Sequence, residues 1–286
     1  MLAPFSLVSA HLQWGLIRNH SGLRATMTAV SVEFVAPPSQ GRVFRSRRRV
    51  HLGDVDASAR LRLEAIARYL QDVATDDADD ARLSERAGVW VVRSIDVEIV
   101  QRPWYHEALE LTTFCSGTGP RWAERRTTVL GEQGARVETV ALWVFVDRER
   151  GRPLVLDDDF HRIYGEAAGT RRVRGRLRHG APTAEARVRP WSLRASDFDV
   201  LDHVNNARSL EAIEDEMTQR LPGGIPVRAR VEYRGTVERG DAVELASDVR
   251  ERDGAGPELA AWLSVGGDVR VSATVCVGDE PADRRA

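Results

Sequence analysis

The chain contains no lysine. All 41 of its basic residues other than histidine are arginines. They are balanced by 43 Asp and Glu residues, and the formal net charge is -2. A net charge so close to zero gives no overall attraction to nucleic acid or to a membrane surface. We interpret the exclusive use of arginine as a compositional bias rather than as a functional signal.

Cysteine is equally scarce. The two cysteines, Cys115 and Cys276, lie in apolar, strand-like runs and show no metal-ligand spacing. Two cysteines are too few for the disulfide scaffold of a small secreted protein. We therefore expect both to be buried packing groups in a reducing cytoplasm, and no spacing in the chain predicts a metal or an organic cofactor.

Long apolar runs are also absent, and none approaches the roughly 20 residues that a membrane helix requires. The first stretch, Met1 to Gln40, has neither a basic start before a long apolar core nor a small-residue cleavage site, so it does not resemble a signal peptide. We expect a disordered extension over residues 1–42, or an upstream start codon with the true start at Met27.

The most informative stretch runs from Asp197 to Asn206 and holds three carboxylates, a histidine and two asparagines in ten residues. It directly precedes apolar residues that recur at steps of three and four, which predicts a helix with one buried face. These residues are Val204, Ala207, Leu210, Ile213 and Met217. The polar run therefore lies at the entrance to an amphipathic helix. The chain as a whole has 286 residues, of which 42% are hydrophobic and 29% charged, a composition typical of a globular protein.

A polar run at a helix entrance has two interpretations. Asp and Asn side chains satisfy the free backbone N–H groups at a helix N-terminus, so the simpler interpretation is a helix cap. The His-Val-Asn-Asn that follows Asp-x-Asp makes a cap alone a poor explanation, because it adds acid–base groups beyond what capping requires. The second interpretation is an active site beside the positive end of the helix dipole.

The chain also contains an internal repeat. Asp54 to Leu61 resembles Asp197 to Val204, 143 positions later, and both stretches open an amphipathic helix. Strand patterns of period two follow each helix. They cover residues 93–100, 109–116, 123–129 and 137–146 in the first half, and 227–233, 242–250, 258–265 and 269–277 in the second. A helix followed by an antiparallel meander needs the sheet to bury it, which predicts an α+β fold.

The motif Asp-x-Asp-x-x-x-His-Val-Asn-Asn at 197–206 resembles the signature of hotdog-fold thioesterases, and in detail the C-terminal half of acyl-acyl-carrier-protein thioesterases. Residues 90–104 and 109–117 are similar to the N-terminal half of that family, and Val231-Glu232-Tyr233-Arg234 is similar to its Leu-Glu-Tyr-Arg strand. The resemblance extends from Phe44 to about Val277. It implies a double hotdog, in which two tandem repeats each wrap an antiparallel sheet around a central helix.

With this resemblance we expect an N-terminal hotdog domain at 43–156, an Arg-rich linker at 157–188, a C-terminal hotdog domain at 189–278 that carries the catalytic loop, and a tail at 279–286. The arginines of the linker, from Arg171 to Arg178, are either part of a solvated tether or a docking segment for the acidic acyl carrier protein. Arg45 to Arg49 is the other candidate docking segment. No aromatic-rich motif accompanies either run, so we do not expect nucleic acid binding.

The function implied by the resemblance is that of a cytoplasmic acyl-[acyl-carrier-protein] thioesterase, which releases free fatty acid from acyl carrier protein in fatty acid biosynthesis. Acyl-coenzyme A is the alternative substrate, no cofactor or metal is implied, and a homodimer is left open. Thioester hydrolysis needs a proton acceptor for the attacking water and donors for the oxyanion. We expect Asp199 to be the catalytic carboxylate, which either activates the water or attacks the thioester directly. His203 either orients water or substrate, or bonds to the loop backbone.

Asp197, Asn205 and Asn206 are expected to support the loop. The family pattern would place an Asn where this chain has Leu201, and a Glu near Thr236. Glu238, two residues further on, compensates only if the strand contains a bulge. Two alternatives therefore stay open beside the hydrolase: an acyl-thioester-binding protein that has lost the chemistry and, with less support, a hotdog dehydratase.

In the first half, Ala59 and Arg60 stand where the second half has Asp202 and His203. We therefore expect the first half to shape the acyl pocket rather than to catalyse.

Overall fold

The computed structural model describes residues 35–83, 88–147, 149–252 and 256–278. The expected tail and most of the expected N-terminal extension, including Met27, lie outside the described residues. Within the described part of the chain, no helix is both long enough and apolar enough to cross a membrane.

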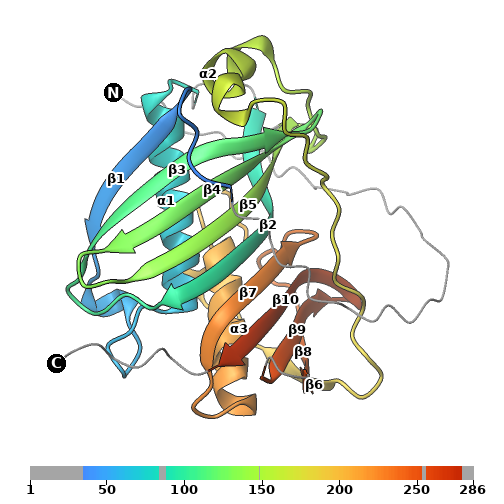
Figure 1. Cartoon of the computed structure of the whole chain (residues 1–286). Helices are drawn as coiled ribbons and strands as arrows, with labels where there is room; N and C mark the ends of the chain where they lie inside the picture. Colours follow the sequence, from blue (N-terminus) through green and yellow to red (C-terminus); the bar gives the residue numbers. More distant parts are fainter. Residues whose placement is uncertain (1–34, 84–87, 148, 253–255, 279–286) are drawn as a thin grey trace.

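Ten strands form one antiparallel sheet, in the order β1-β3-β4-β5-β2-β7-β10-β9-β8-β6 (Figure 1). Each repeat contributes five neighbouring strands, and β2 pairs with β7 at the seam between the repeats. The strands are β1 (Val43–Arg49), β2 (Gly88–Gln101), β3 (Ala108–Thr118), β4 (Trp122–Gly131), β5 (Arg136–Asp147), β6 (Arg187–Trp191), β7 (Ile225–Tyr233), β8 (Val243–Arg250), β9 (Glu258–Val265) and β10 (Asp268–Gly278).

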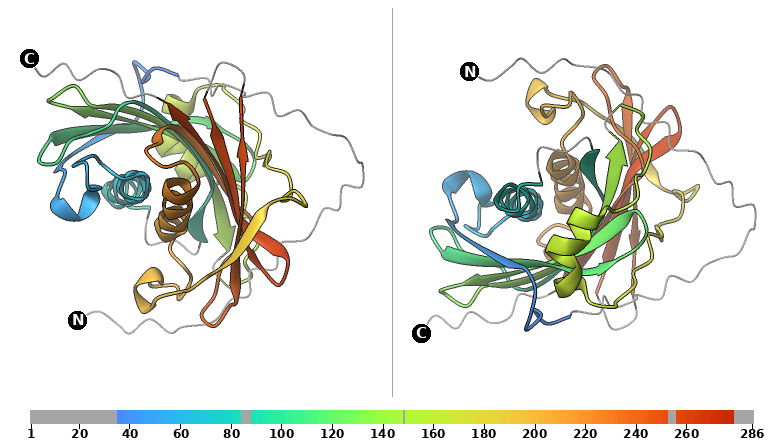
Figure 2. Two further views of the ribbon diagram at one scale, coloured as in Figure 1. Left: turned by 90° about the horizontal axis from the view of Figure 1, so that it is seen from below. Right: turned by 90° about the horizontal axis from the view of Figure 1, so that it is seen from above.

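Two helices, α1 (Leu63–Asp80) and α3 (Asn206–Arg220), lie side by side on one face of the sheet, which curves around them (Figure 2). A single turn of 3-10 helix precedes each, η1 (Leu52–Asp54) and η2 (Ala195–Asp197). The apolar stripes expected from the sequence are buried in both helices. These observations confirm the α+β fold and the double hotdog arrangement.

One hydrophobic core serves both repeats. Its residues include Ile66 and Val73 from α1, Leu210 and Ile213 from α3, and Leu263 from β9. Burying a side chain of this size contributes roughly 1.5–3 kcal/mol. Because the same cluster draws on both halves, we expect the repeats to unfold as one cooperative unit.

The eight strand patterns found in the sequence correspond to β2–β5 and β7–β10, while β1 and β6 were not predicted. Both missed strands lie at the edges of the sheet. In β1, Arg45, Arg47 and Arg49 point to solvent. Charged residues on edge strands protect the open edge against pairing with another chain, and they also conceal the strand pattern in the sequence.

A third helix, α2 (Asp158–Ala168), occupies the start of the segment expected to be a linker. The Asp157 carboxylate accepts a hydrogen bond from the Phe160 N–H at 2.8 Å and caps it. Phe160, Tyr164 and Ala168 bury one face of α2 in a small cluster with Trp90 and Phe145. No helix was expected in this segment, although the spacing of four residues between these apolar side chains indicates the buried face.

The two cysteines differ in burial. Cys115 is buried, and burial raises the pKa of its thiol to about 11. Cys276 is only half-buried, so the expectation that both are buried was wrong for this residue. Neither forms a disulfide, and both are held as thiols within the sheet.

Candidate active site

The polar run before α3 folds into a tight loop. The Asp199 N–H donates to the carbonyl oxygen of His203 at 2.9 Å, and the Asp202 N–H donates to that of Asp199 at 3.0 Å. Asp202 has φ +58°, a left-handed conformation that Asp tolerates better than most residues. The loop therefore returns on itself, and Phe198 pairs with Val204 just before the helix begins.

The Asp199 carboxylate has one hydrogen bond within the described part of the chain. Its Oδ1 accepts from the Leu201 N–H at 2.9 Å. The side chain is half-buried, so the second oxygen is available to accept a proton from water or substrate. This availability is what a general base requires.

The equivalent carboxylate in the first half, Asp56, is fully engaged. Its Oδ1 accepts from the N–H and Oγ of Ser58 at 2.9 and 2.6 Å, and Arg102 lies 2.7 Å from Oδ2. Although burial opposes it, hydrogen bonds from Ser58 and Arg60 and the charge of Arg102 lower the pKa of Asp56. Both carboxylate oxygens of Asp56 are thus engaged, whereas only Oδ1 of Asp199 has a partner among the described residues.

The counterpart of His203 in the first half, Arg60, is also unsuited to acid–base catalysis. Arg60 is buried, and its guanidinium carbon lies 3.2 Å from the centre of the Trp104 ring. Its Nη1 donates to the carbonyl oxygen of Arg102 at 2.9 Å. Because a guanidinium stays protonated near neutral pH, an arginine cannot supply the acid–base chemistry of a histidine at this position.

The segment after β7 lies along the loop. His203 and Glu238 form an isolated antiparallel bridge, and the Val204 N–H donates to the carbonyl oxygen of Val237 at 2.9 Å. The Glu238 N–H donates to Asp241 at 2.8 Å, which fixes the turn. Thr236 is half-buried on the same segment. The fold therefore brings Glu238 beside His203, although no side-chain hydrogen bond joins them within the described residues.

Asp197 supports the base of the loop. It is fully buried, and its carboxylate accepts from the Arg194 N–H at 2.7 Å and from the Arg194 guanidinium at 3.1 Å. Its carbonyl oxygen accepts from the Asn205 N–H at 2.8 Å. These contacts fit the supporting role expected for Asp197, which stays a prediction until turnover is measured.

Two asparagines form the start of α3, and a tyrosine from the end of β7 contacts it. Asn205 is the N-cap, and its Oδ1 accepts from the Ala207 N–H at 2.9 Å. The Tyr233 hydroxyl donates to the carbonyl oxygen of Asn206 at 3.1 Å. Burial raises the pKa of Tyr233 far above neutral, so this hydroxyl stays a donor. Sequence reasoning did not select Tyr233, although its place in Val-Glu-Tyr-Arg was the available signal.

The two helix N-termini differ in what they bind. At α1, the N–H groups of Leu63 and Glu64 donate to the Glu214 carboxylate at 2.9 and 3.2 Å. At α3, no described residue accepts from the Asn206 N–H. A helix N-terminus with free N–H groups is suited to stabilise a negative charge. An oxyanion could therefore bind at the N-terminus of α3 but not at that of α1.

The described residues hold no group of three or more His, Cys, Asp or Glu side chains that is arranged for a metal ion. A groove of about 390 Å³ lies between β1 and α1, lined by residues that include Arg47, Arg48, Asp72 and Thr75. This polar lining does not suit an acyl chain.

Comparison with known proteins agrees with this architecture. The model of the acyl-ACP thioesterase N-terminal domain matches residues 41–164, and that of the C-terminal domain matches residues 180–275. The chain belongs to the acyl-ACP thioesterase family. A relative in Mycobacterium tuberculosis (strain H37Rv), the uncharacterised protein Rv2001, is 27% identical over 244 residues, which is 85% of this chain and 96% of the relative.

Solved structures of thioesterases share the fold. The 12:0-ACP thioesterase from Umbellularia californica superposes with a TM-score of 0.70 at 18% identity, covering 82% of this chain and 94% of that one. An acyl-ACP thioesterase from Bacteroides thetaiotaomicron gives 0.69 at 19% identity, covering 82% and 98%. At these identities the likeness supports the double hotdog fold.

Proposed function

We propose that this member of the acyl-ACP thioesterase family hydrolyses acyl thioesters in the cytoplasm, releasing free fatty acid from acyl carrier protein in fatty acid biosynthesis, with acyl-coenzyme A as a surrogate. The observation that carries the proposal is the Asp199 carboxylate, with one oxygen free of described partners, in a loop that leads into the open N-terminus of α3. A base and an oxyanion site are the two components that the reaction requires.

In the proposed reaction, water attacks the thioester carbonyl carbon and Asp199 takes its proton. The carbonyl oxygen becomes an oxyanion, which the Asn206 N–H and the positive end of the α3 dipole stabilise. The carbon–sulfur bond then breaks and the thiolate takes the proton from Asp199, which leaves a free acid and a thiol. His203 on the loop and Glu238 on the neighbouring segment are proposed to orient the water or the substrate.

The competing function is binding without hydrolysis. Leu201 favours it, because this side chain is 52% exposed beside Asp199 and cannot form a hydrogen bond where the family pattern has Asn. Thr236 favours it as well, since it stands where the family has a carboxylate. A tightly bound acyl thioester that remains intact over hours would support this alternative.

The deciding experiment is a thiol-release assay on a panel of acyl-ACP and acyl-coenzyme A thioesters from short to long chains. Turnover on at least one member is expected, with the Asp199→Asn protein as the control against contaminating hydrolases. Absence of turnover on every chain length and both carriers would refute the hydrolase.

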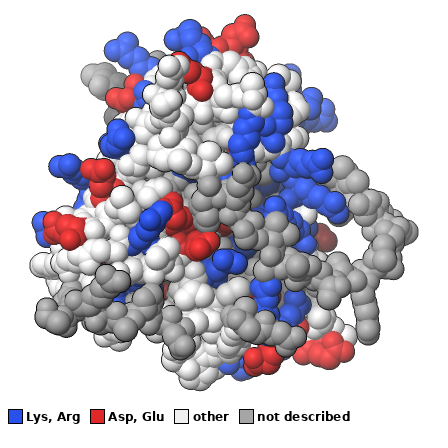
Figure 3. Space-filling view, in the orientation of Figure 1, with Lys and Arg blue, Asp and Glu red and all other residues white. Residues whose placement is uncertain are grey.

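For the carrier protein, the arrangement of the linker favours one of the two arginine runs. Arg172, Arg174, Arg176 and Arg178 are exposed, whereas the residues between them are half-buried. We call these four arginines the basic ridge. Figure 3 shows basic side chains gathered along the side of the molecule where this connection runs. Such a row is complementary to an acidic protein surface.

The ridge is anchored to the sheet rather than loosely tethered. Trp122 Nε1 donates to the carbonyl oxygen of Val173 at 3.0 Å, and the buried Glu232 carboxylate accepts from the N–H groups of Arg178 and His179 at 2.7 and 3.1 Å. An anchored row loses less conformational entropy on binding than a free tether.

The arginines of β1 are largely engaged within the protein. Arg47 lies 3.3 Å from Glu110, Arg48 lies 2.9 Å from Asp72, and Arg49 donates to the carbonyl oxygen of His106 at 2.7 Å. We therefore propose the basic ridge, and not β1, as the docking surface for acyl carrier protein.

A further inference from the structure

Glu214 connects the two repeats at the N-terminus of α1, where free backbone N–H groups would otherwise attract an anion. It lies on α3, yet its carboxylate accepts hydrogen bonds from the N–H groups of Leu63 at 2.9 Å and Glu64 at 3.2 Å, the first two residues of α1. Burial raises the pKa of Glu214, and these two amide bonds oppose the rise. A carboxylate thus occupies the helix end that corresponds to the open N-terminus of α3.

The internal repeat makes this correspondence specific. At the offset of 143 positions that relates Asp54 to Asp197, Leu63 corresponds to Asn206, the first residue of α3. The same offset relates Glu214 to Gln71 of α1. The first half therefore receives a carboxylate from its partner helix, whereas the sequence has a neutral glutamine, Gln71, at the mirrored position of α1.

We propose that the N-terminus of α1 is a second oxyanion-type site, permanently occupied by the carboxylate of Glu214, so that each chain offers a single thioester site, at α3. A carboxylate oxygen and a thioester oxyanion use the same amide donors. The tethered carboxylate has a high effective concentration at the α1 N-terminus, which excludes a diffusing thioester. The thioester part of this proposal rests on the proposed function, and the anion part does not.

The anion part is tested by chemical rescue of the full-length Glu214→Ala protein. Removing the carboxylate leaves two amides without their acceptor and should lower the melting temperature by roughly 4–10 °C. Sodium formate, a carboxylate small enough for the vacated space, should then raise the melting temperature well beyond sodium chloride at equal ionic strength. An equal response to both salts would overturn the proposal.

Gln71→Ala is the matched control, since it truncates the mirrored position. This variant and the wild-type protein should show no formate-specific response. If the Glu214→Ala protein does not fold in chloride, it is refolded in sodium formate and in sodium chloride at equal ionic strength. Recovery of folded protein in formate alone is expected, and equal recovery in the two salts would contradict the proposal.

The thioester part is tested by calorimetric stoichiometry with dodecyl-coenzyme A thioether, which cannot be hydrolysed. Wild-type and Gln71→Ala proteins should bind one ligand per chain, and Glu214→Ala should bind a second, weaker one. A stoichiometry of one for Glu214→Ala despite formate rescue would reject the thioester part alone. No binding to the wild-type protein would count against the proposed function, while the formate result would still decide the anion part.

Discussion

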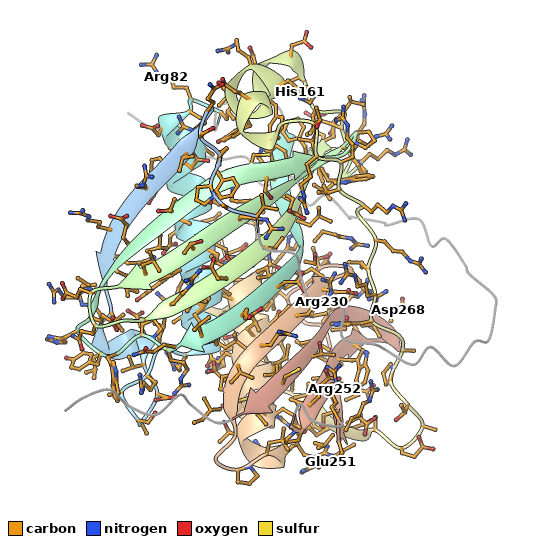
Figure 4. All side chains as sticks on the ribbon, in the orientation of Figure 1. Arg82, His161, Arg230, Glu251, Arg252 and Asp268 are labelled. Carbon is orange, nitrogen blue, oxygen red and sulfur yellow. The ribbon has the colours of Figure 1, made fainter. Side chains whose placement is uncertain are left out.

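Nη1 of Arg230 in β7 lies 2.7 and 2.6 Å from the two carboxylate oxygens of Asp96 in β2, so a charged pair crosses the seam between the repeats. Figure 4 labels Arg230 at this junction. The two side chains are only 14% and 13% exposed. Burial raises the pKa of Asp96, and the charge of Arg230 opposes that rise. Arg230 also lies 2.9 Å from the buried Glu232, which anchors the linker.

Arg230→Met should destabilise the protein strongly, because it leaves the carboxylates of Asp96 and Glu232 without their shared cation. Losing one partner of a buried pair costs about 3–5 kcal/mol. Urea unfolding should show this loss, and the Arg230→Met/Asp96→Asn double variant should lose less than the sum of the single changes. Additive losses would show that the pair does not couple the repeats.

Asp199→Asn should reduce turnover by roughly 10²–10⁴-fold, the usual contribution of a general base. The melting temperature should stay within about a degree, because the asparagine oxygen can still accept from the Leu201 N–H. Asp56→Asn is the mirrored control: it should keep turnover and lose stability, since Asp56 serves Arg102 and Ser58. Wild-type rates for Asp199→Asn with normal melting would move attention to Glu238.

Asp197→Asn is a second control, on the same loop. Its buried carboxylate is paired with Arg194, so the change should cost about 1–3 kcal/mol of stability. Turnover per folded molecule should remain close to wild type if Asp197 only supports the loop. A large loss of turnover in fully folded protein would instead make Asp197 part of the reaction.

Glu214 should make the protein less stable as the pH rises. Its folded-state pKa is raised above the value of 4.5 of an unfolded glutamate, mainly by burial, although Arg62 and Arg102 lower it. The folded state then binds more protons than the unfolded state between 4.5 and the raised pKa. Stability relative to Glu214→Gln should therefore be greatest below pH 4.5 and decline through this window. Denaturant titrations of both proteins across pH 4–8 would show this, and parallel curves would contradict it.

Arg174→Glu/Arg176→Glu should raise the KM for acyl-ACP about tenfold and leave the KM for acyl-coenzyme A unchanged. Each reversed charge should cost about 0.7 kcal/mol of binding free energy, a typical value for an exposed pair, and two such changes give about a tenfold loss. The effect should shrink as salt is added. Arg45→Glu/Arg47→Glu on β1 is the matched control of equal charge change. A larger effect from the β1 pair would place carrier docking on that strand.

Much of the architecture could be read from the sequence, because its signals are local. The buried faces of α1 and α3 follow from apolar residues three and four positions apart, and eight strands follow from alternation. The elements that were not predicted, such as β1 and α2, have a signal that charged residues obscure. In β1 arginines face solvent, and the short stripe of Phe160, Tyr164 and Ala168 in α2 lies in an otherwise charged segment.

The sequence by itself determined the loop motif and the repeat, since a motif and its second copy are both visible in the order of residues, and it is the basis on which Asp199 is proposed as the base. The tertiary structure alone decided which of two similar helix ends is open. Glu214 reaches Leu63 from 151 positions away, and no local pattern encodes such a contact. It forms because the core that both repeats share packs α1 against α3, and folding brings a carboxylate onto the free amides of one helix but not of the other.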